Sequence, residues 1–148
     1  MTDISSETTR AVAAQYDEFQ TSLEDVGLPT EFLNYGFRVS RKQSYVEMQK
    51  QMCLEVFRAA EIGASDNIID VGFGTGAQAL LLSDTHPFAR YTGFNIAEKQ
   101  VEFATRRAAE RNLSAKLTFQ HGEAEVLPGV ANASVELLRS ACSQSKLV

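Results

Sequence analysis

The sequence predicts an α/β fold, in which an open parallel sheet is flanked by helices. Two observations lead to this prediction. From residue 67 onward, short apolar runs of strand length alternate with amphipathic segments of helix length, in the order strand, helix, strand, helix, strand. A glycine-rich turn at residues 72–76 joins the first strand to the helix after it. Such alternation is typical of parallel sheets with right-handed crossovers.

Two helices are expected before the first strand, because apolar residues recur there at spacings of three and four. We expect the helices at residues 5–25 and 42–62, with a turn at 33–37 between them. The expected apolar faces consist of Val12, Tyr16, Phe19 and Leu23 in the first helix, and of Tyr45, Met48, Met52, Val56 and Ala59 in the second. Residues 1–41 are predicted to form a helical leader or lid, and residues 42–148 the ligand-binding domain.

The remaining elements follow from β-branched runs, helical periodicity and breakers. The expected strands are residues 68–71, 89–94, 115–120 and 134–138. One helix is expected at 77–82, ended by His86 and Pro87. The next is expected to run to residue 111 from a capping box, with Asn95 as the cap and Glu98 three residues later. Arg139 is expected to weaken the fourth strand, because a parallel strand is usually buried on both faces.

Composition narrows the class of protein. The chain has 148 residues, which corresponds to one domain, and a formal net charge of -5, which argues against nucleic acid or an anionic membrane as a partner. No apolar run is long enough to span a bilayer, and the first residues lack the pattern of a secretion signal. The two cysteines have the spacing of neither a disulfide framework nor a metal site. We therefore expect free thiols in a reducing compartment, which indicates a cytoplasmic protein, and no metal site.

The turn after the first strand is the most informative segment. Gly72, Gly74 and Gly76 allow the backbone to approach a ligand closely, and the N-terminus of the next helix lies beside them. A nucleotide-like ligand is therefore expected there. The glycine spacing also fits a dinucleotide site, but Asp70 would repel a pyrophosphate, and Asn95 stands where an acid would bind the ribose. A sulfonium ligand that carries an ammonium group suits Asp70 better.

Four segments together resemble class I S-adenosylmethionine-dependent methyltransferases. They are IDVGFGTG at residues 69–76, TGFNIAEKQV at 92–101, QHGEAEVLP at 120–128 and, upstream, LNYGF at 33–37. The last is similar to an entry segment of the small-molecule branch, whose members methylate sterols, tocopherols, sugars and polyketides. The resemblance implies a Rossmann-like sheet of seven strands, of which about four are present, so the chain is expected to be incomplete at its C-terminus.

The resemblance also implies S-adenosylmethionine as the cofactor and assigns roles to residues. Asp70 would bind the methionine ammonium, Asn95 the ribose hydroxyls with Gln100 beside them, and Glu123 the adenine amino group. The other implied cofactor contacts are Gly72, Phe73, Gly74, Thr75, Gly76, Ile96 and Ala124. Tyr16 and Tyr35 are candidate substrate contacts, although aromatic residues at such positions often serve packing alone. No catalytic residue or general base is identified.

The predicted function is methyl transfer to the oxygen, nitrogen or carbon of a small-molecule acceptor. Two alternatives stay open: a truncated, catalytically inactive binding module and, less favoured, an NAD(P)-dependent oxidoreductase. A sheet of four strands would leave an edge open, so a second chain or a second copy is an expected partner.

Overall fold

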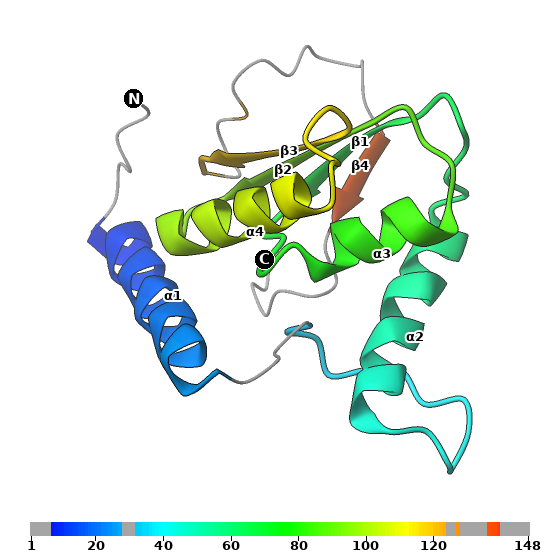
Figure 1. Cartoon of the computed structure of the whole chain (residues 1–148), viewed down its shortest axis with the longest axis horizontal. Coiled ribbons are helices and arrows are strands. Elements are labelled where there is room, and N and C mark those ends of the chain that lie inside the picture. Colours follow the sequence, from blue (N-terminus) through cyan, green and yellow to red (C-terminus); the bar gives the residue numbers. More distant parts are fainter. Residues whose placement is uncertain (1–6, 28–31, 124–126, 128–135, 140–148) are drawn as a thin grey trace.

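The computed structural model describes residues 7–27, 32–123, 127 and 136–139. Four parallel strands form one sheet in the order β3-β2-β1-β4, flanked by helices (Figure 1). The strands are β1 (Asn67–Val71), β2 (Arg90–Asn95), β3 (Leu117–His121) and β4 (Glu136–Arg139). The helices are α1 (Glu7–Val26), α2 (Tyr45–Ala59), α3 (Ala77–Thr85) and α4 (Glu98–Glu110). The predicted Rossmann-like parallel sheet is confirmed, whereas the division of the chain at residue 41 stays a prediction.

Strand register brings the carboxyl ends of the strands together. Val71 lies opposite Phe94 on one side and Arg139 on the other, and Asn95 lies opposite His121. The glycine turn that follows β1 is therefore next to the end of β2. The expected fourth strand is present as β4, and Arg139 is its last residue. The weakening of this strand by Arg139 stays a prediction.

An aromatic cluster joins the glycine turn to the sheet. Phe73 is fully buried, and its ring centroid lies 4.8 Å from that of Phe119, which in turn lies 5.8 Å from that of Tyr91. Gly93 makes room for this packing, since a Cβ there would lie 2.6 Å from Phe73 Cδ1. The second residue of the turn is thus inserted into the core, which fixes the position of the turn above β2.

The expected apolar faces of the first two helices are only partly buried, and the most buried residues lie one position further along each helix. The half-buried residues of the expected faces are Tyr16, Leu23, Met48, Met52 and Val56. In α1 the buried residues are Ala13 and Gln20, while Val12 and Phe19 are exposed. In α2 they are Gln49, Cys53 and Phe57, while Tyr45 is exposed. One residue turns a helix by about 100°. Each buried face also contains a glutamine, which a prediction based on hydropathy places on the exposed face.

The expected start of α4 was also wrong. Asn95 is the last residue of β2, and the N-cap of α4 is Ala97, which makes no side-chain cap. A complete capping box lies instead at the start of α2, where Ser44 Oγ accepts from Glu47 N and Glu47 Oε2 accepts from Ser44 N. Asn95 is retained in the strand because β2 continues to pair with β3 up to that residue.

The segment at residues 32–37 is anchored on α2 through a buried asparagine. Asn34 Nδ2 donates to the Gln49 carbonyl (3.1 Å), and Gln49 Nε2 donates back to the carbonyls of Phe32 (2.9 Å) and Asn34 (2.8 Å). Gly36 has φ 84° and lies so close to α2 that a Cβ would be 2.7 Å from Met48 Cβ. This packing explains the asparagine at 34 and the glycine at 36. It also places Leu33 against Gly74, where a Cβ would lie 3.1 Å from Leu33 Cδ1.

Asn34→Ala is expected to lower the free energy of unfolding by about 1–3 kcal/mol, because it leaves buried backbone groups without partners. Urea denaturation measures this change. Val39→Ala, at an exposed position of the same connecting segment, is expected to change stability by less than about 0.5 kcal/mol. Equal stabilities of the two variants would contradict the anchoring role of Asn34.

Candidate functional site

The turn between β1 and α3 is left-handed at three glycines. Gly72, Gly74 and Gly76 have φ values of 80°, 58° and 75°. Gly72 N donates to the Phe94 carbonyl (2.7 Å), which ties the turn to β2. Gly76 is the N-cap of α3, and a Cβ there would lie 2.8 Å from Ala104 Cβ of α4. Residues with side chains are strained in this conformation, so the glycines are needed for the backbone path itself.

Asp70 lies in β1, directly before this turn, and is 4% exposed. Its Oδ2 accepts from the Tyr91 hydroxyl (2.5 Å) and from Gln78 Nε2 (3.3 Å). Its Oδ1 is buried and has no hydrogen-bond partner within the described part of the chain. Burial raises the pKa of Asp70 from 3.8 to about 6, and the hydrogen bonds from Tyr91 and Gln78 partly oppose this rise. One carboxylate oxygen is thus available for a donor that a ligand brings.

A chain of hydrogen bonds orients the amides at the end of β2. Asn95 Oδ1 accepts from Ala97 N (3.1 Å), and Asn95 Nδ2 donates to Gln100 Oε1 (2.8 Å). Because a backbone N–H can only donate, this contact fixes the Asn95 amide and, through it, the Gln100 amide. Gln100 Nε2 is left buried without a partner among the described residues. Gln100 Nε2, on α4 beside the end of β2, is therefore a donor suited to a hydroxyl or carbonyl oxygen of a ligand.

The other predicted cofactor residues lie along the same edge of the sheet. The Phe73 side chain is in the core, so only its backbone is available to a ligand at the turn. Thr75 is buried and Ile96 is half-buried, with the Ile96 carbonyl 3.0 Å from His121 Nε2. Gly122 N donates to the Asn95 carbonyl (3.0 Å), which brings the half-buried Glu123 next to the end of β2. Ala124 lies outside the described residues.

The two candidate substrate residues lie on separate segments. Tyr16 is half-buried on α1, and Tyr35 is 73% exposed next to the buried Asn34. Contact between either tyrosine and an acceptor stays a prediction.

Sequence reasoning missed the two partners of Asp70. Tyr91 lies opposite Ile68, two residues before the pair formed by Asp70 and Gly93, so it is a diagonal neighbour of Asp70 on the sheet. Aligning the two predicted strands in parallel would have suggested this contact. Gln78 also donates to the Phe73 carbonyl (2.6 Å) and links the turn to α3; its inward orientation has no signal in the sequence.

The described residues contain no group of three or more histidine, cysteine or acidic side chains that could hold a metal ion. None of the helices described is long and apolar enough to cross a membrane.

Comparisons with known proteins agree with this geometry. The profile of a family described as a methyltransferase domain matches residues 68–145, just over half of the chain. Erythromycin 3''-O-methyltransferase from Saccharopolyspora erythraea is 31% identical over 66% of this chain and 32% of its own length. An O-methyltransferase from Pyrenophora dematioidea is 29% identical over 92% of this chain and 51% of its own. The chain thus spans between a third and about half of the length of these relatives.

Solved structures share the fold. The crystal structure of the (4+2)-cyclase SpnF superposes with a TM-score of 0.71 at 26% identity, over 79% of this chain and 43% of that one. Geranyl diphosphate C-methyltransferase from Streptomyces coelicolor A3(2) superposes with a TM-score of 0.67 at 15% identity, over 85% of this chain and 51% of that one, a likeness of fold alone.

The family profile begins within β1 and includes the glycine turn, Asp70 and the Asn95–Gln100 pair, which are the parts of the site described above. This match favours the methyltransferase prediction over the NAD(P)-dependent oxidoreductase alternative. The chain belongs to the class I S-adenosylmethionine-dependent methyltransferase family.

Proposed function

We propose that the protein binds S-adenosylmethionine at the carboxyl edge of the sheet and transfers its methyl group to a small-molecule acceptor. The observation that carries this proposal is the buried Asp70, whose unpartnered carboxylate oxygen lies directly before the glycine turn. The relatives named for O-methylation of erythromycin and for methylation of 27-O-demethylrifamycin SV support an acceptor of the polyketide kind. The expected cytoplasmic location and the partner at the open sheet edge belong to this proposal as well.

The residues present fit the charge pattern of the cofactor. A buried carboxylate with a free oxygen is unfavourable unless a cation or donor reaches it, and the methionine ammonium is both. The glycine turn leaves room for the backbone to approach the methionine and ribose. Gln100 Nε2 offers a donor to a ribose hydroxyl, while Asn95 orients Gln100. Glu123, next to the end of β2, would accept from the adenine amino group.

The contribution of the chain to catalysis is binding and orientation. The bound cofactor supplies an electrophilic methyl group on a sulfonium that is a good leaving group. Asp70 and the glycine turn would hold the methionine end in place, and the buried walls of the site would exclude water from the reacting atoms. A base is needed only for an acceptor that must lose a proton, and no residue is assigned to that role.

A second candidate function is a reaction of a bound small molecule without methyl transfer. The likeness to the (4+2)-cyclase SpnF favours it, because that protein carries a cyclase name on this fold. Incubation with cofactor labelled in its methyl group separates the two candidates. Label in the product supports methyl transfer, whereas an altered acceptor without label supports the second candidate.

Asp70→Asn is expected to weaken the binding of S-adenosylhomocysteine by about 10- to 100-fold in calorimetric titration, because a hydrogen bond to a charged group is lost. The stability of the variant at pH 7.5 is expected to equal or exceed that of the wild type, since ionisation of the buried Asp70 opposes folding above its unfolded-state pKa. Asp84→Asn, which removes an exposed carboxylate of α3, is the matched control, with affinity expected within about twofold of the wild type. Unchanged affinity in Asp70→Asn would contradict the proposal.

The affinity for S-adenosylhomocysteine is also expected to depend on pH. Burial raises the pKa of Asp70 to about 6, so below that pH a proton competes with the ligand ammonium for the carboxylate. The dissociation constant is expected to rise by up to about tenfold per pH unit below pH 6 and to level off above it. Titrations from pH 5 to 8 measure this, and Asp70→Asn is expected to abolish the dependence. An equally steep profile in the variant would mean that another group is responsible.

A further inference from the structure

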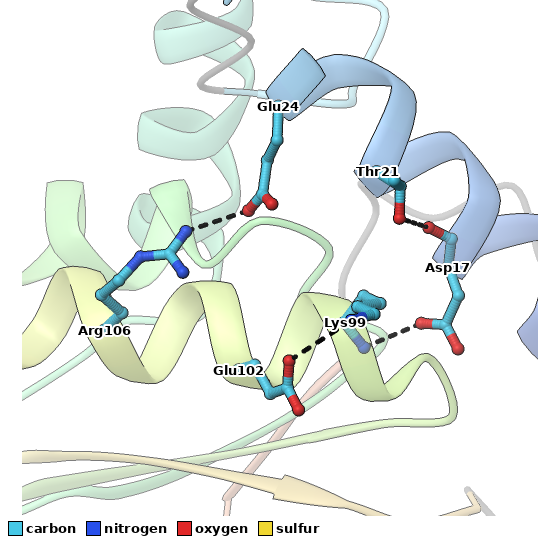
Figure 2. Close-up of polar contacts among 6 residues, drawn as sticks. All are labelled: Asp17, Thr21, Glu24, Lys99, Glu102 and Arg106. Atoms are coloured by element: carbon cyan, nitrogen blue, oxygen red, sulfur yellow. Dashed lines mark hydrogen bonds and ion pairs between the residues drawn. The ribbon is translucent and has the colours of Figure 1, made fainter.

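Two polar contacts hold helix α1 on α4, and the residues that make them have the same spacing on both helices. Asp17 Oδ1 accepts from the backbone N–H of Lys99 (2.8 Å), and Arg106 Nη2 donates to Glu24 Oε1 (2.9 Å), as Figure 2 shows. The two contacts are seven residues apart on each helix, so α1 and α4 run in the same direction over two turns. The N-cap Ala97 provides no side-chain cap, and Asp17 satisfies an amide in the first turn of α4 from outside.

A buried glutamine follows each partner of the Asp17–Lys99 contact in the sequence. Gln20 lies one turn after Asp17 on the same face of α1 and is 2% exposed, and Gln100 follows Lys99 and is 1% exposed. Gln20 Oε1 and Gln100 Nε2 have no hydrogen-bond partner in the described part of the molecule. One is an acceptor and the other a donor. A hydroxyl both donates and accepts, so a hydroxyl group of a ligand suits either atom.

Burying these two atoms without partners is unfavourable, and this cost opposes the packing of α1 on α4 in the absence of a ligand. A ligand that satisfies them removes the cost. The packing of α1 and the binding of such a ligand would therefore strengthen each other by the same factor.

We propose that α1 forms one wall of the cofactor site, with the side-chain amide of Gln20 bound to a ribose hydroxyl of the cofactor opposite Gln100. This inference rests on the proposed function and adds to it a residue that precedes the nucleotide-binding fold in the chain. Gln20 is a binding residue in this arrangement. Asp17 is a positioning residue that holds Gln20 in place by binding the first turn of α4.

The test compares Gln20→Met, which keeps the length of the side chain and removes its polar atoms, with Gln15→Met on the exposed face of the same helix. Titration calorimetry with S-adenosylhomocysteine gives the affinity, and thermal unfolding without ligand gives the stability. Gln20→Met is expected to weaken binding about tenfold and to unfold at the same or a higher temperature than the wild type, because an unpartnered buried atom is gone. Gln15→Met is expected to leave both quantities unchanged.

Analogues of S-adenosylhomocysteine that lack the 2′- or the 3′-hydroxyl identify the group that is bound. The wild type is expected to prefer the complete ligand over both analogues, and Gln20→Met is expected to lose this preference for one of them. The same preference in both proteins, or unchanged affinity in Gln20→Met, would overturn the inference while the proposed function stands. Failure of the wild type to bind S-adenosylhomocysteine would overturn both.

Asp17 is tested by rescue. Asp17→Ala is expected to weaken ligand binding several-fold, and Asp17→Asn, which keeps an acceptor for Lys99 N, is expected to restore most of it. Glu18→Gln, at an exposed position of α1, is the control and is expected to change affinity by less than about twofold. If Asp17→Ala binds as the wild type does, Asp17 does not position the wall of the site.

Discussion

Asp70 joins three elements of the fold through one carboxylate oxygen. It belongs to β1, accepts from Tyr91 of β2 and accepts from Gln78 of α3. These contacts form where the glycine turn leaves the sheet, and Gln78 also binds the Phe73 carbonyl within that turn. A carboxylate buried in this way is costly on its own, and its raised pKa reflects that cost. The other oxygen, Oδ1, has no partner among the described residues and is proposed to bind the ligand. Asp70 would therefore both connect elements of the fold and bind the cofactor.

Polar groups on inner faces are a general feature of this chain. Each helix buries one glutamine: Gln20 in α1, Gln49 in α2, Gln78 in α3 and Gln100 in α4. Gln49 anchors the segment at residues 32–37, and Gln78 supports the glycine turn. Gln100 continues the chain of hydrogen bonds that begins at Asn95. Two of these amides, those of Gln78 and Gln100, thus connect helices to the edge of the sheet where the cofactor is proposed to bind, which is consistent with a similar role for Gln20.

The region before the sheet is closely connected to the proposed site. Leu33 packs on Gly74, and Asp17 binds the first turn of α4. Two separate parts of the chain before α2 therefore contact the glycine turn and the first turn of α4. Such contacts would allow this region to contribute to the affinity for the cofactor.

The sequence by itself determined the order of elements, the parallel sheet and the glycine turn, because these depend on residues that are neighbours in the chain. Short β-branched runs, breakers and glycines act locally, and the resemblance of four segments supplied the family. Only the tertiary structure decided which helix faces are buried, since a glutamine is buried wherever the surrounding fold offers partners. It likewise decided the start of α4 and the contacts of Asp70 with Tyr91 and of Asp17 with Lys99. The last two pairs are 21 and 82 residues apart. The first contact follows only once the register of β1 and β2 is known, and the second has no signal in the sequence.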